Sequence, residues 1–297
     1  MAGCTDLAFR LMVRQFGPRL CYFEMVDMNC LIHGPLKNLD ILKTSAEDTP
    51  LAAQLVGSDP EKMLKAARHL LGIVKVSYLE VNSACPVRKI VAKKAGAQLL
   101  KDPDRLYRMI ETLATNIPLP ITVKLRTAKN IVEIARGCEA AGAQALMVHG
   151  RTAEKKYSGP VDYAAIRAVK QAVKIPVLGS GNILSRELAE KMFEETGCDG
   201  VLAARGALGD PWIFKALTEK DFKPPTVKER IEALKEHISL MEEHKKTRES
   251  NRVGFMKKIV IWYAAKFPKA QEFKQQVLAA KSRDKILTLI EDYSYSL

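Results

Sequence analysis

Hydrophobic residues gather in seven short runs along the first two thirds of the 297-residue chain. Most of the runs are rich in branched or aliphatic side chains, which favour β-strands. Between them, stretches such as 59–74 and 130–143 carry apolar residues at helical spacing. This alternation predicts parallel strands joined by crossover helices. The runs span residues 20–25, 50–56, 77–81, 121–125, 145–148, 175–179 and 200–204.

Two architectures fit this alternation, a doubly wound sheet and a (β/α)8 TIM barrel. The repeating part ends near residue 217, close to the roughly 200–250 residues that such barrels need. Polar and charged residues also follow nearly every run, where the active sites of barrels lie. We therefore predict an α/β fold with a TIM barrel over residues 1–217. The residues at these strand ends are Glu24, Gln54, Asn82, Cys85, Lys124, Arg126, His149, Arg151, Ser180, Gly181, Asn182 and Arg205.

Seven runs are one strand short of a closed barrel. Residues 1–17 have the pattern of a loop and helix that follow a strand, with Thr5 or Asp6 as the helix N-cap. We therefore expect the first strand to be missing or truncated.

The pattern changes after residue 217. Residues 218–228 have the polar and proline content of a linker. From 229 onward helices are expected, and we predict a small all-helical domain over 229–297. Its apolar stripes are Ile231, Leu234, Ile238 and Met241, and then Phe255, Ile259 and Trp262.

Positive charge is concentrated in this helical part. The chain carries a net charge of +13, and residues 245–285 hold twelve Lys or Arg against three Asp or Glu. Such a patch is typical of a polyanion-binding surface, because neutralised phosphates release counterions. A solvated helix face is the alternative, and this feature alone does not decide between them.

The remaining composition excludes several classes. The six cysteines are scattered without a C-x-x-C pair, which argues against a zinc site or a disulfide framework and favours a reducing, cytoplasmic setting. No apolar run approaches the roughly 18 residues of a membrane span. The N-terminus also lacks the pattern of a signal peptide. We expect neither a metal site nor a membrane partner.

Three features point to a bound anion or carbonyl group. The loops "GSGNILS" and "ARGALGDPW" carry glycines after the last two strands, where barrels often bind phosphate. Lys124 and Arg126 share the face of their strand with Thr122, and at a buried position they need an anionic or carbonyl partner. His149 is expected to contact the same ligand. Cys85 follows a buried strand, and taken alone it favours packing over chemistry, since free cysteine is among the most buried residue types.

The motifs together resemble the flavin-dependent tRNA-dihydrouridine synthases, in particular the bacterial branch. They include "MAGCTDLAFR", "EVNSACPVRKIVAKKAGAQLLKDP", "MVHGRTAEKKYSGPVDY", "IPVLGSGNI" and "ARGALGDPWIF". The resemblance implies FMN at the barrel mouth and NADPH as its reductant. It places Asn82 on the uracil and makes Cys85 the proton donor to C5 while hydride reaches C6. It places Met1, Ala2, Gln54, Lys124 and His149 around the flavin ring, and Ser180, Gly181, Asn182, Ala204 and Arg205 around its phosphate.

The resemblance also implies a role for the basic helical part. A uridine inside folded tRNA must be swung out, which costs a few kcal/mol in unstacking. Phosphate contacts offset that cost. We expect substrate contacts from Arg126, Arg151, Lys257 and Lys258, and a monomer acting on tRNA.

The sequence departs from the family pattern in two places. The family has a strand and a proline before M-A-G, and its phosphate loop reads N-G-D where this chain has Ser180-Gly181-Asn182. Two other functions stay open: a flavin-dependent dehydrogenase or reductase of free pyrimidines, and a non-catalytic tRNA-binding module. The sequence indicates neither the target uridine nor a preference for NADPH over NADH.

Overall fold

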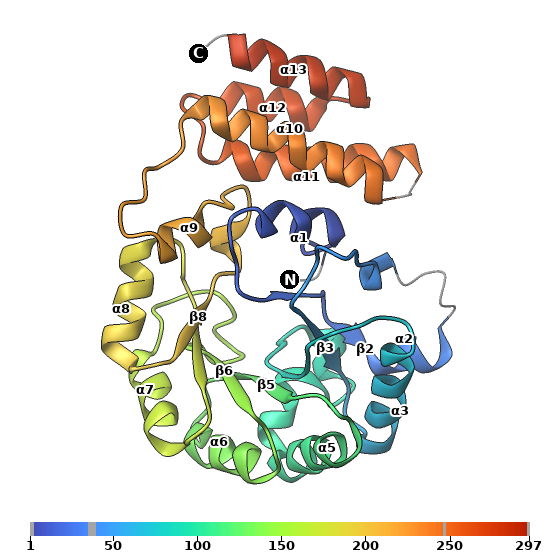
Figure 1. Ribbon diagram of the computed structural model, residues 1–297, viewed down its shortest axis with the longest axis vertical. Helices are drawn as coiled ribbons and strands as arrows, with labels where there is room; N and C mark the ends of the chain where they lie inside the picture. The colour runs from blue at the N-terminus through green and yellow to red at the C-terminus, as the bar shows by residue number, and fades with distance from the viewer. Residues whose placement is uncertain (1–2, 35–39, 246–247, 296–297) are drawn as a thin grey trace.

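The seven hydrophobic runs form one curled parallel sheet in the computed structural model, which describes residues 3–34, 40–245 and 248–295 (Figure 1). The first run is split into β1 (Cys21–Tyr22) and β2 (Val26–Asp27), which both pair with β3 (Leu51–Val56). The other strands follow in chain order, each parallel to its neighbour: β4 (Tyr78–Ser83), β5 (Ile121–Arg126), β6 (Ala145–His149), β7 (Val177–Ser180) and β8 (Gly200–Leu202).

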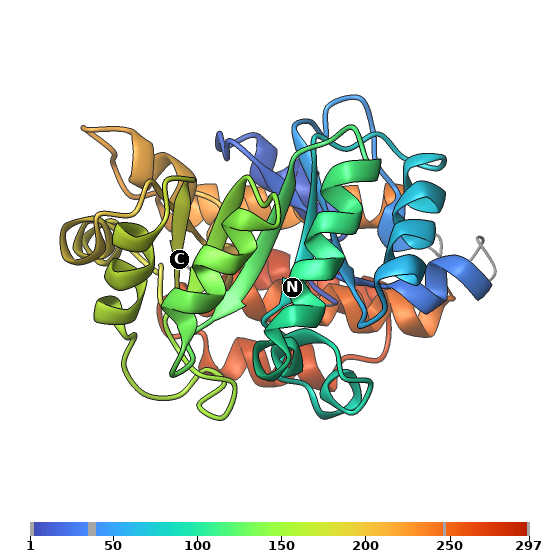
Figure 2. The same cartoon turned by 90° about the horizontal axis from the view of Figure 1, so that it is seen from below.

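Helices cover the outer face of this sheet (Figure 2). Leu55, Val81, Val123 and Leu146 are fully buried in the core between the sheet and the helices. The helices of this part of the chain are α2 (Met28–His33), α3 (Pro60–Leu71), α4 (Arg88–Val91), α5 (Pro103–Asn116), α6 (Ile131–Ala140), α7 (Tyr163–Ala172), α8 (Arg186–Thr196) and α9 (Ile213–Thr218), with 3-10 turns at Asp40–Leu42, Gly96–Lys101 and Arg205–Ala207. The helical patterns predicted at 59–74 and 130–143 are confirmed as α3 and α6.

The prediction of a TIM-barrel fold with C-terminal helices is confirmed, with one qualification about closure. Within the described part of the chain, β1 forms one edge of the sheet and β8 the other, and these two strands do not pair. The three residues of β8 are accordingly only half-buried. The sheet is therefore a curled, open version of the barrel.

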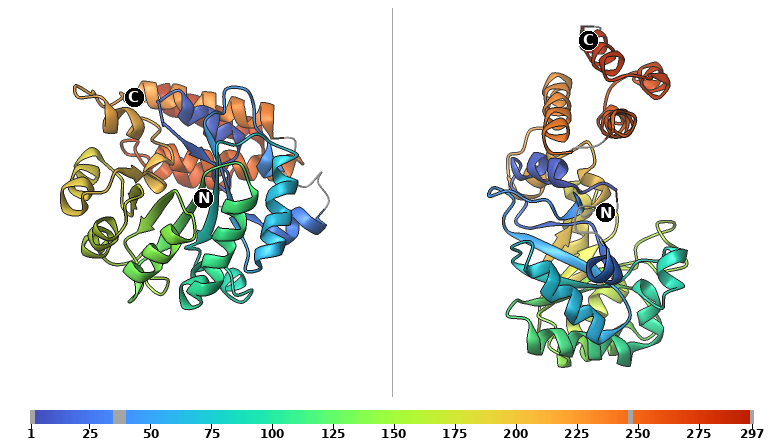
Figure 3. Two further views of the ribbon diagram at one scale, coloured as in Figure 1. Left: turned by 60° about the horizontal axis from the view of Figure 1, so that its bottom comes forward. Right: turned by 90° about the vertical axis from the view of Figure 1, so that its right-hand side faces the viewer.

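The first helix, α1 (Leu7–Arg14), is shared between two hydrophobic cores. Asp6 caps it by accepting a hydrogen bond from the Phe9 nitrogen at 3.1 Å, which confirms the predicted cap. Phe9 and Val13 pack into the core of the sheet. Ala8, Met12 and Phe16 pack instead against the C-terminal helices. Figures 1 and 3 show α1 lying between the sheet and those helices.

The C-terminal helices are α10 (Val227–His244), α11 (Glu249–Ala264), α12 (Gln271–Ala279) and α13 (Arg283–Tyr295). The first begins at Val227, slightly before the expected start, because Thr226 and Glu229 form a reciprocal capping box. The predicted stripe is buried, as Ile231, Leu234, Ile238 and Met241 are at most 2% exposed.

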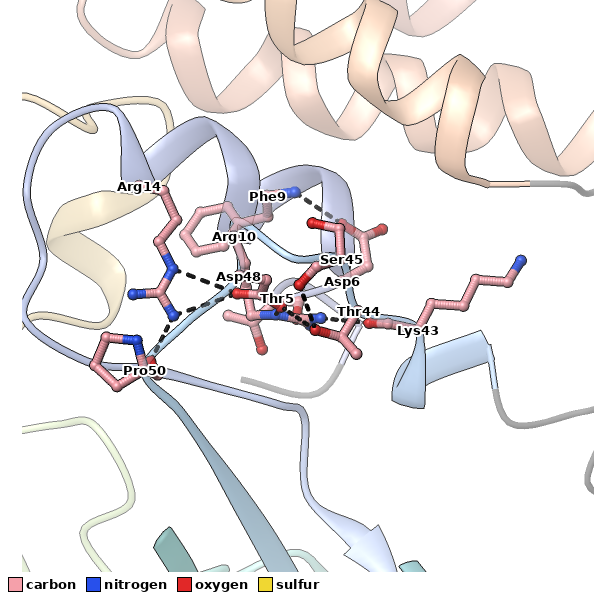
Figure 4. Close-up of polar contacts among 10 residues, drawn as sticks. All are labelled: Thr5, Asp6, Phe9, Arg10, Arg14, Lys43, Thr44, Ser45, Asp48 and Pro50. Carbon is pink, nitrogen blue, oxygen red and sulfur yellow. Dashed lines mark hydrogen bonds and ion pairs between the residues drawn. The ribbon is translucent and has the colours of Figure 1, made fainter. Parts of the chain in front are cut away.

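A buried ion pair fixes the loop before α1 (Figure 4). Arg10 is 1% exposed, and its Nε donates to Asp48 at 2.8 Å. Its two terminal nitrogens donate to the carbonyl oxygens of Thr5 at 2.7 Å and Lys43 at 2.6 Å. Arg14 donates to the same Asp48 carboxylate at 3.3 Å. Residues far apart in sequence are thereby held together beside the sheet.

The same loop is held from the other side by the C-terminal helices. Lys258 Nζ on α11 donates to the carbonyl oxygen of Gly3, and Lys245 Nζ lies 2.7 Å from Asp6. The Gly3 nitrogen in turn donates to Glu24, which lies between β1 and β2. The N-terminal loop therefore connects the C-terminal helices to the strand ends.

Candidate active site

Most of the predicted site residues lie at the carboxyl ends of adjacent strands. Asn82 on β4 is in register with Lys124 on β5, and Arg126 is in register with His149 on β6. His149 is in turn in register with Ser180 on β7. Since the carboxyl ends of parallel strands share one edge, these side chains form a single polar site.

The loop that carries Cys85 is fixed by the side chain of Asn82. Asn82 Oδ1 accepts hydrogen bonds from the backbone nitrogens of Ala84 at 3.1 Å and Cys85 at 2.9 Å. The Cys85 carbonyl accepts from the Ala97 nitrogen at 3.0 Å. Gly96 permits this return, because it has φ +59° and a Cβ there would lie 2.6 Å from the Cys85 oxygen. Cys85 is thus presented, partly buried, by a loop with little freedom.

A buried carboxylate beneath this loop was not predicted from the sequence. Glu80 on β4 is 1% exposed and accepts a hydrogen bond from the side-chain amide of Gln54. Burial raises the pKa of Glu80, while the Gln54 hydrogen bond and the Lys124 ammonium oppose that rise. The signal was a glutamate in the middle of an apolar strand, where a charge needs a partner.

Lys124 is the corresponding buried cation. Burial lowers the pKa of Lys124, and the nearby Glu80 carboxylate opposes that lowering. Among the described residues, the buried Lys124 Nζ has no hydrogen-bond acceptor. A buried ammonium without an acceptor is costly, so this nitrogen fits a ligand that brings an acceptor atom into the site.

Arg126 and Arg151 lie at the same edge, but their guanidinium groups are held by backbone carbonyls. Arg126 is 2% exposed and donates to Ala84 at 2.7 Å and to Lys156 at 2.8 Å. Arg151, equally buried, donates to Gly159 at 2.7 Å. Arg126 therefore joins the Cys85 loop to the loop after β6, a contact that the sequence did not predict. A substrate contact for either arginine stays a prediction.

His149 is a neutral imidazole surrounded by cations. Burial, together with Lys124 and the arginines 126, 151 and 205, lowers the pKa of His149 to about 3. The ring of Tyr157 lies 6.2 Å from it, with Arg126 at 5.6 Å and Arg205 at 5.3 Å from the tyrosine ring. Tyr157 is 56% exposed, so it stands at the border between the site and solvent.

The two glycine-bearing loops pack against each other. Gly181 and Asn182 adopt left-handed φ angles of +127° and +55° directly after β7. Arg205 donates to Asn182 Oδ1 at 2.9 Å. At Gly206 a Cβ would lie 2.2 Å from the Ile183 carbonyl oxygen, so glycine is required for the two loops to meet. The predicted phosphate residues Ser180, Gly181, Asn182, Ala204 and Arg205 thus belong to two adjoining turns at the edge of the sheet.

Two groups of predicted residues remain. Met1 and Ala2 fall outside the described residues. Lys257 and Lys258 lie on α11, where Lys257 Nζ donates to the Leu278 carbonyl at 2.8 Å and Lys258 Nζ contacts Gly3. Their expected contact with tRNA stays a prediction.

Metal and membrane features are absent from the described part of the chain. It contains no cluster of three or more His, Cys, Asp or Glu side chains placed to hold a metal ion. Across the same residues, every helix is too short or too polar to cross a membrane.

The curled parallel sheet and the polar groups at its carboxyl edge define an enzyme of the TIM-barrel class. The family model described as dihydrouridine synthase (Dus) matches residues 1–295. The chain is 35% identical over 286 residues to tRNA-dihydrouridine synthase B of Pseudomonas aeruginosa, covering 93% of this chain and 85% of that protein. It is 31% identical over 303 residues to tRNA-dihydrouridine synthase B of Xanthomonas axonopodis pv. citri, covering 99% and 90%. The chain belongs to the dihydrouridine synthase family, which confirms the resemblance seen in its motifs.

The solved structures support the fold alone. Histamine dehydrogenase from Rhizobium sp. 4-9 superposes with a TM-score of 0.56 at 13% identity. The match covers 80% of this chain and 47% of that one, so the chain spans about half the length of this structural relative.

Proposed function

We propose that this protein reduces the C5=C6 bond of uridines in tRNA to dihydrouridine, using FMN as cofactor, NADPH as the hydride source and Cys85 as the proton donor. The observation that carries the proposal is that a fixed loop holds Cys85 just after β4, next to the strand that carries the buried Lys124, whose Nζ has no hydrogen-bond acceptor among the described residues. Two relatives, from Pseudomonas aeruginosa and Xanthomonas axonopodis pv. citri, are both named tRNA-dihydrouridine synthase B, which supports the same reaction.

The residues present fit a flavin. The Lys124 ammonium lacks a hydrogen-bond acceptor among the described residues, and a flavin ring carries carbonyl and nitrogen acceptors. The turns at Ser180–Asn182 and Ala204–Arg205 offer backbone amides and a guanidinium, which suit a phosphate. Bound FMN would take a hydride from NADPH and pass it to C6 of the uracil. Gln54, His149, Met1 and Ala2 complete the proposed flavin site.

Cys85 supplies the other half of the reduction. Hydride at C6 leaves a negative charge on C5 and the neighbouring carbonyl, and the S–H bond of Cys85 breaks to give its proton to C5. The thiolate then takes a proton from solvent. Each uridine therefore consumes one NADPH and one proton. The backbone hydrogen bonds of Ala84 and Cys85 to Asn82 keep the sulfur in a fixed position for this transfer.

The electrostatics of the site favour the developing negative charge. Lys124, Arg126, Arg151 and Arg205 lie around His149, whose lowered pKa keeps the imidazole neutral near pH 7. A neutral imidazole donates or accepts a hydrogen bond without adding to the crowding of cations. Asn82 is proposed to contact the uracil, and Arg126 and Arg151 to shape the substrate side of the site.

The C-terminal helices are proposed to bind the tRNA backbone. Lys281 and Lys285 are exposed at the start of α13, and Lys257 on α11 reaches the Leu278 carbonyl nearby. These three lysines, here called the basic surface, suit phosphate contacts. Lys258 belongs to the same proposal, although it also contacts the N-terminal loop. A cytoplasmic monomer is part of this proposal.

Two variants separate the proposed reaction from its alternatives. Anaerobically reduced protein is mixed with tRNA that lacks dihydrouridine, and flavin reoxidation is followed. We expect reoxidation by tRNA, no reoxidation by free uracil or orotate, and loss of the reaction in Cys85→Ala. The matched control is Cys138→Ala, because Cys138 is a buried thiol remote from this edge, on α6. Turnover of a free pyrimidine alone, or tRNA binding by protein that holds no flavin, would favour the alternatives.

A further inference from the structure

A continuous chain of hydrogen bonds leads from Glu80 to the backbone of Cys85. The Glu80 carboxylate accepts from Gln54 Nε2, and Gln54 Oε1 accepts from Asn82 Nδ2 at 2.7 Å. Asn82 Oδ1 then accepts from the nitrogens of Ala84 and Cys85. Every link except the last joins buried or half-buried side chains from β3 and β4.

The groups at the two ends of this hydrogen-bond chain determine the donor-to-acceptor direction of each hydrogen bond in it. A carboxylate only accepts hydrogen bonds, and a backbone N–H only donates them. Each amide between them offers a donor at one end and an acceptor at the other. In its ionised form Glu80 therefore favours the orientation in which Gln54 presents its NH2 inward and its oxygen to Asn82. This is the same orientation that the backbone N–H groups of Ala84 and Cys85 require of Asn82, so the two ends of the hydrogen-bond chain support each other.

The cost of burying Glu80 argues that its charge has a use. A charged group that is 1% exposed is expensive, and an apolar side chain of similar volume would fill the position at lower cost. Thr122, its register partner on β5, is 2% exposed and stands outside the hydrogen-bond chain. Lys124, on the neighbouring strand, carries a positive charge that opposes the rise in the pKa of Glu80. The hydrogen bond from Gln54 to Glu80 places the carboxylate as an acceptor at the base of the hydrogen-bond chain.

We propose that Glu80 is a positioning residue, which orients the Gln54 and Asn82 amides and through them holds the backbone of Cys85. The role of Cys85 as proton donor rests on the proposed function, whereas the effect of Glu80 on the backbone position of Cys85 does not. Glu80 acts without touching substrate. It also determines which end of the Gln54 amide faces a ligand in the site.

The test is hydrogen exchange at the Ala84 and Cys85 amides in Glu80→Gln. A glutamine at position 80 both donates and accepts, so both amide orientations become possible and the two N–H groups lose their acceptor part of the time. We expect exchange in peptides covering 84–85 to accelerate about tenfold, as for the loss of a hydrogen bond. Thr122→Val is the matched control in the same layer, with no acceleration expected. Glu80→Asp keeps an acceptor-only group and should retain at least part of the protection. Equal exchange in wild type and Glu80→Gln would overturn the proposal.

Turnover distinguishes this proposal from the proposed function. At saturating tRNA, and per bound flavin, Glu80→Gln should reoxidise about tenfold more slowly with the tRNA KM unchanged. Faster exchange at 84–85 without turnover in the wild type would uphold the positioning while rejecting the proposed reaction. Turnover in the wild type with unchanged exchange and unchanged rate in Glu80→Gln would reject the positioning alone.

Discussion

Asn82 Oδ1 lies 2.9 Å from the backbone nitrogen of Cys85, so an asparagine side chain fixes the residue that is proposed to donate the proton. Replacing Asn82 by Ala removes two hydrogen bonds from the loop. We expect tRNA-dependent flavin reoxidation to slow by about 10²-fold, since small misplacements of a reacting group have costs of that order. Single-turnover kinetics on the flavin absorbance measure this change.

The control for that variant is its thermal unfolding. The loss of two hydrogen bonds should lower the free energy of unfolding by only about 1–3 kcal/mol. A rate equal to that of the wild type in a folded Asn82→Ala protein would contradict the role given to this hydrogen bond.

Arg10 is expected to be essential for stability. It is 1% exposed and paired with Asp48, whose side chain is fully buried. Arg10→Ala leaves that buried carboxylate with only the longer contact to Arg14, at 3.3 Å, so we expect a loss of about 3–5 kcal/mol in the free energy of unfolding. Urea unfolding followed by circular dichroism measures it.

Arg14→Ala is the matched comparison for Arg10. Arg14 also contacts Asp48, but its side chain is 11% exposed and Arg10 remains to pair the carboxylate. Arg14→Ala should therefore lower the free energy of unfolding by clearly less than Arg10→Ala does, by about 1 kcal/mol. Equal losses in the two variants would show that the carboxylate has no preferred partner.

The buried His237 predicts a pH dependence of stability. Its ring lies among Phe9, Trp262 and Tyr263, and burial lowers the pKa of His237 to about 4. At pH values between the usual histidine pKa and about 4, the unfolded chain binds more protons than the folded one. Stability from this group is therefore present at pH 7 and is lost as the pH falls through this window.

The measurement compares wild type with His237→Phe. Between about pH 6 and pH 5, the wild type should lose roughly 1 kcal/mol of unfolding free energy more than the variant, which has no proton to bind. Parallel pH profiles would show that His237 titrates alike in both states.

The basic surface predicts a salt-dependent defect in tRNA binding. Lys257→Glu with Lys281→Glu should weaken tRNA binding and reduce the slope of log K against log salt by about 1 for each phosphate that the protein no longer neutralises. Flavin content should not change, because these lysines lie in the C-terminal helical part. Lys65→Glu with Lys174→Glu, which reverses two exposed charges on α3 and just before β7, is the control with the same change in net charge. A defect of equal size in that control would show only a general effect of net charge.

The sequence predicted the fold because strands buried by helices leave a strong local signal. β5 illustrates it: Ile121, Val123 and Leu125 face the helices, while Lys124 lies on the other face. The cap at Asp6 was equally local. The dual packing of α1 was not predictable, since it depends on segments that come some 200 to 220 residues later in the chain (Phe16 packs against Trp212, and Gln15 donates to Glu236).

The site shows the same division between local and distant information. Cys85, Lys124 and His149 could be predicted because each is a polar or reactive residue at or just after the carboxyl end of an apolar strand. The partners of Arg126 and Lys258 could not be read from the sequence, because they are backbone carbonyls 42 and 255 positions away. Glu80 interrupts an apolar strand, but its hydrogen bond to Gln54 joins two strands 26 positions apart, and that pairing is not a local signal.

The central claim, that Cys85 donates the proton during reduction of a tRNA uridine, is tested most directly by one anaerobic measurement. Reduced protein is mixed with tRNA lacking dihydrouridine, and the tRNA is analysed for dihydrouridine while the flavin spectrum is followed. The account predicts fast reoxidation with one dihydrouridine formed for each flavin oxidised, and neither in Cys85→Ala. Undiminished dihydrouridine formation by Cys85→Ala would contradict it.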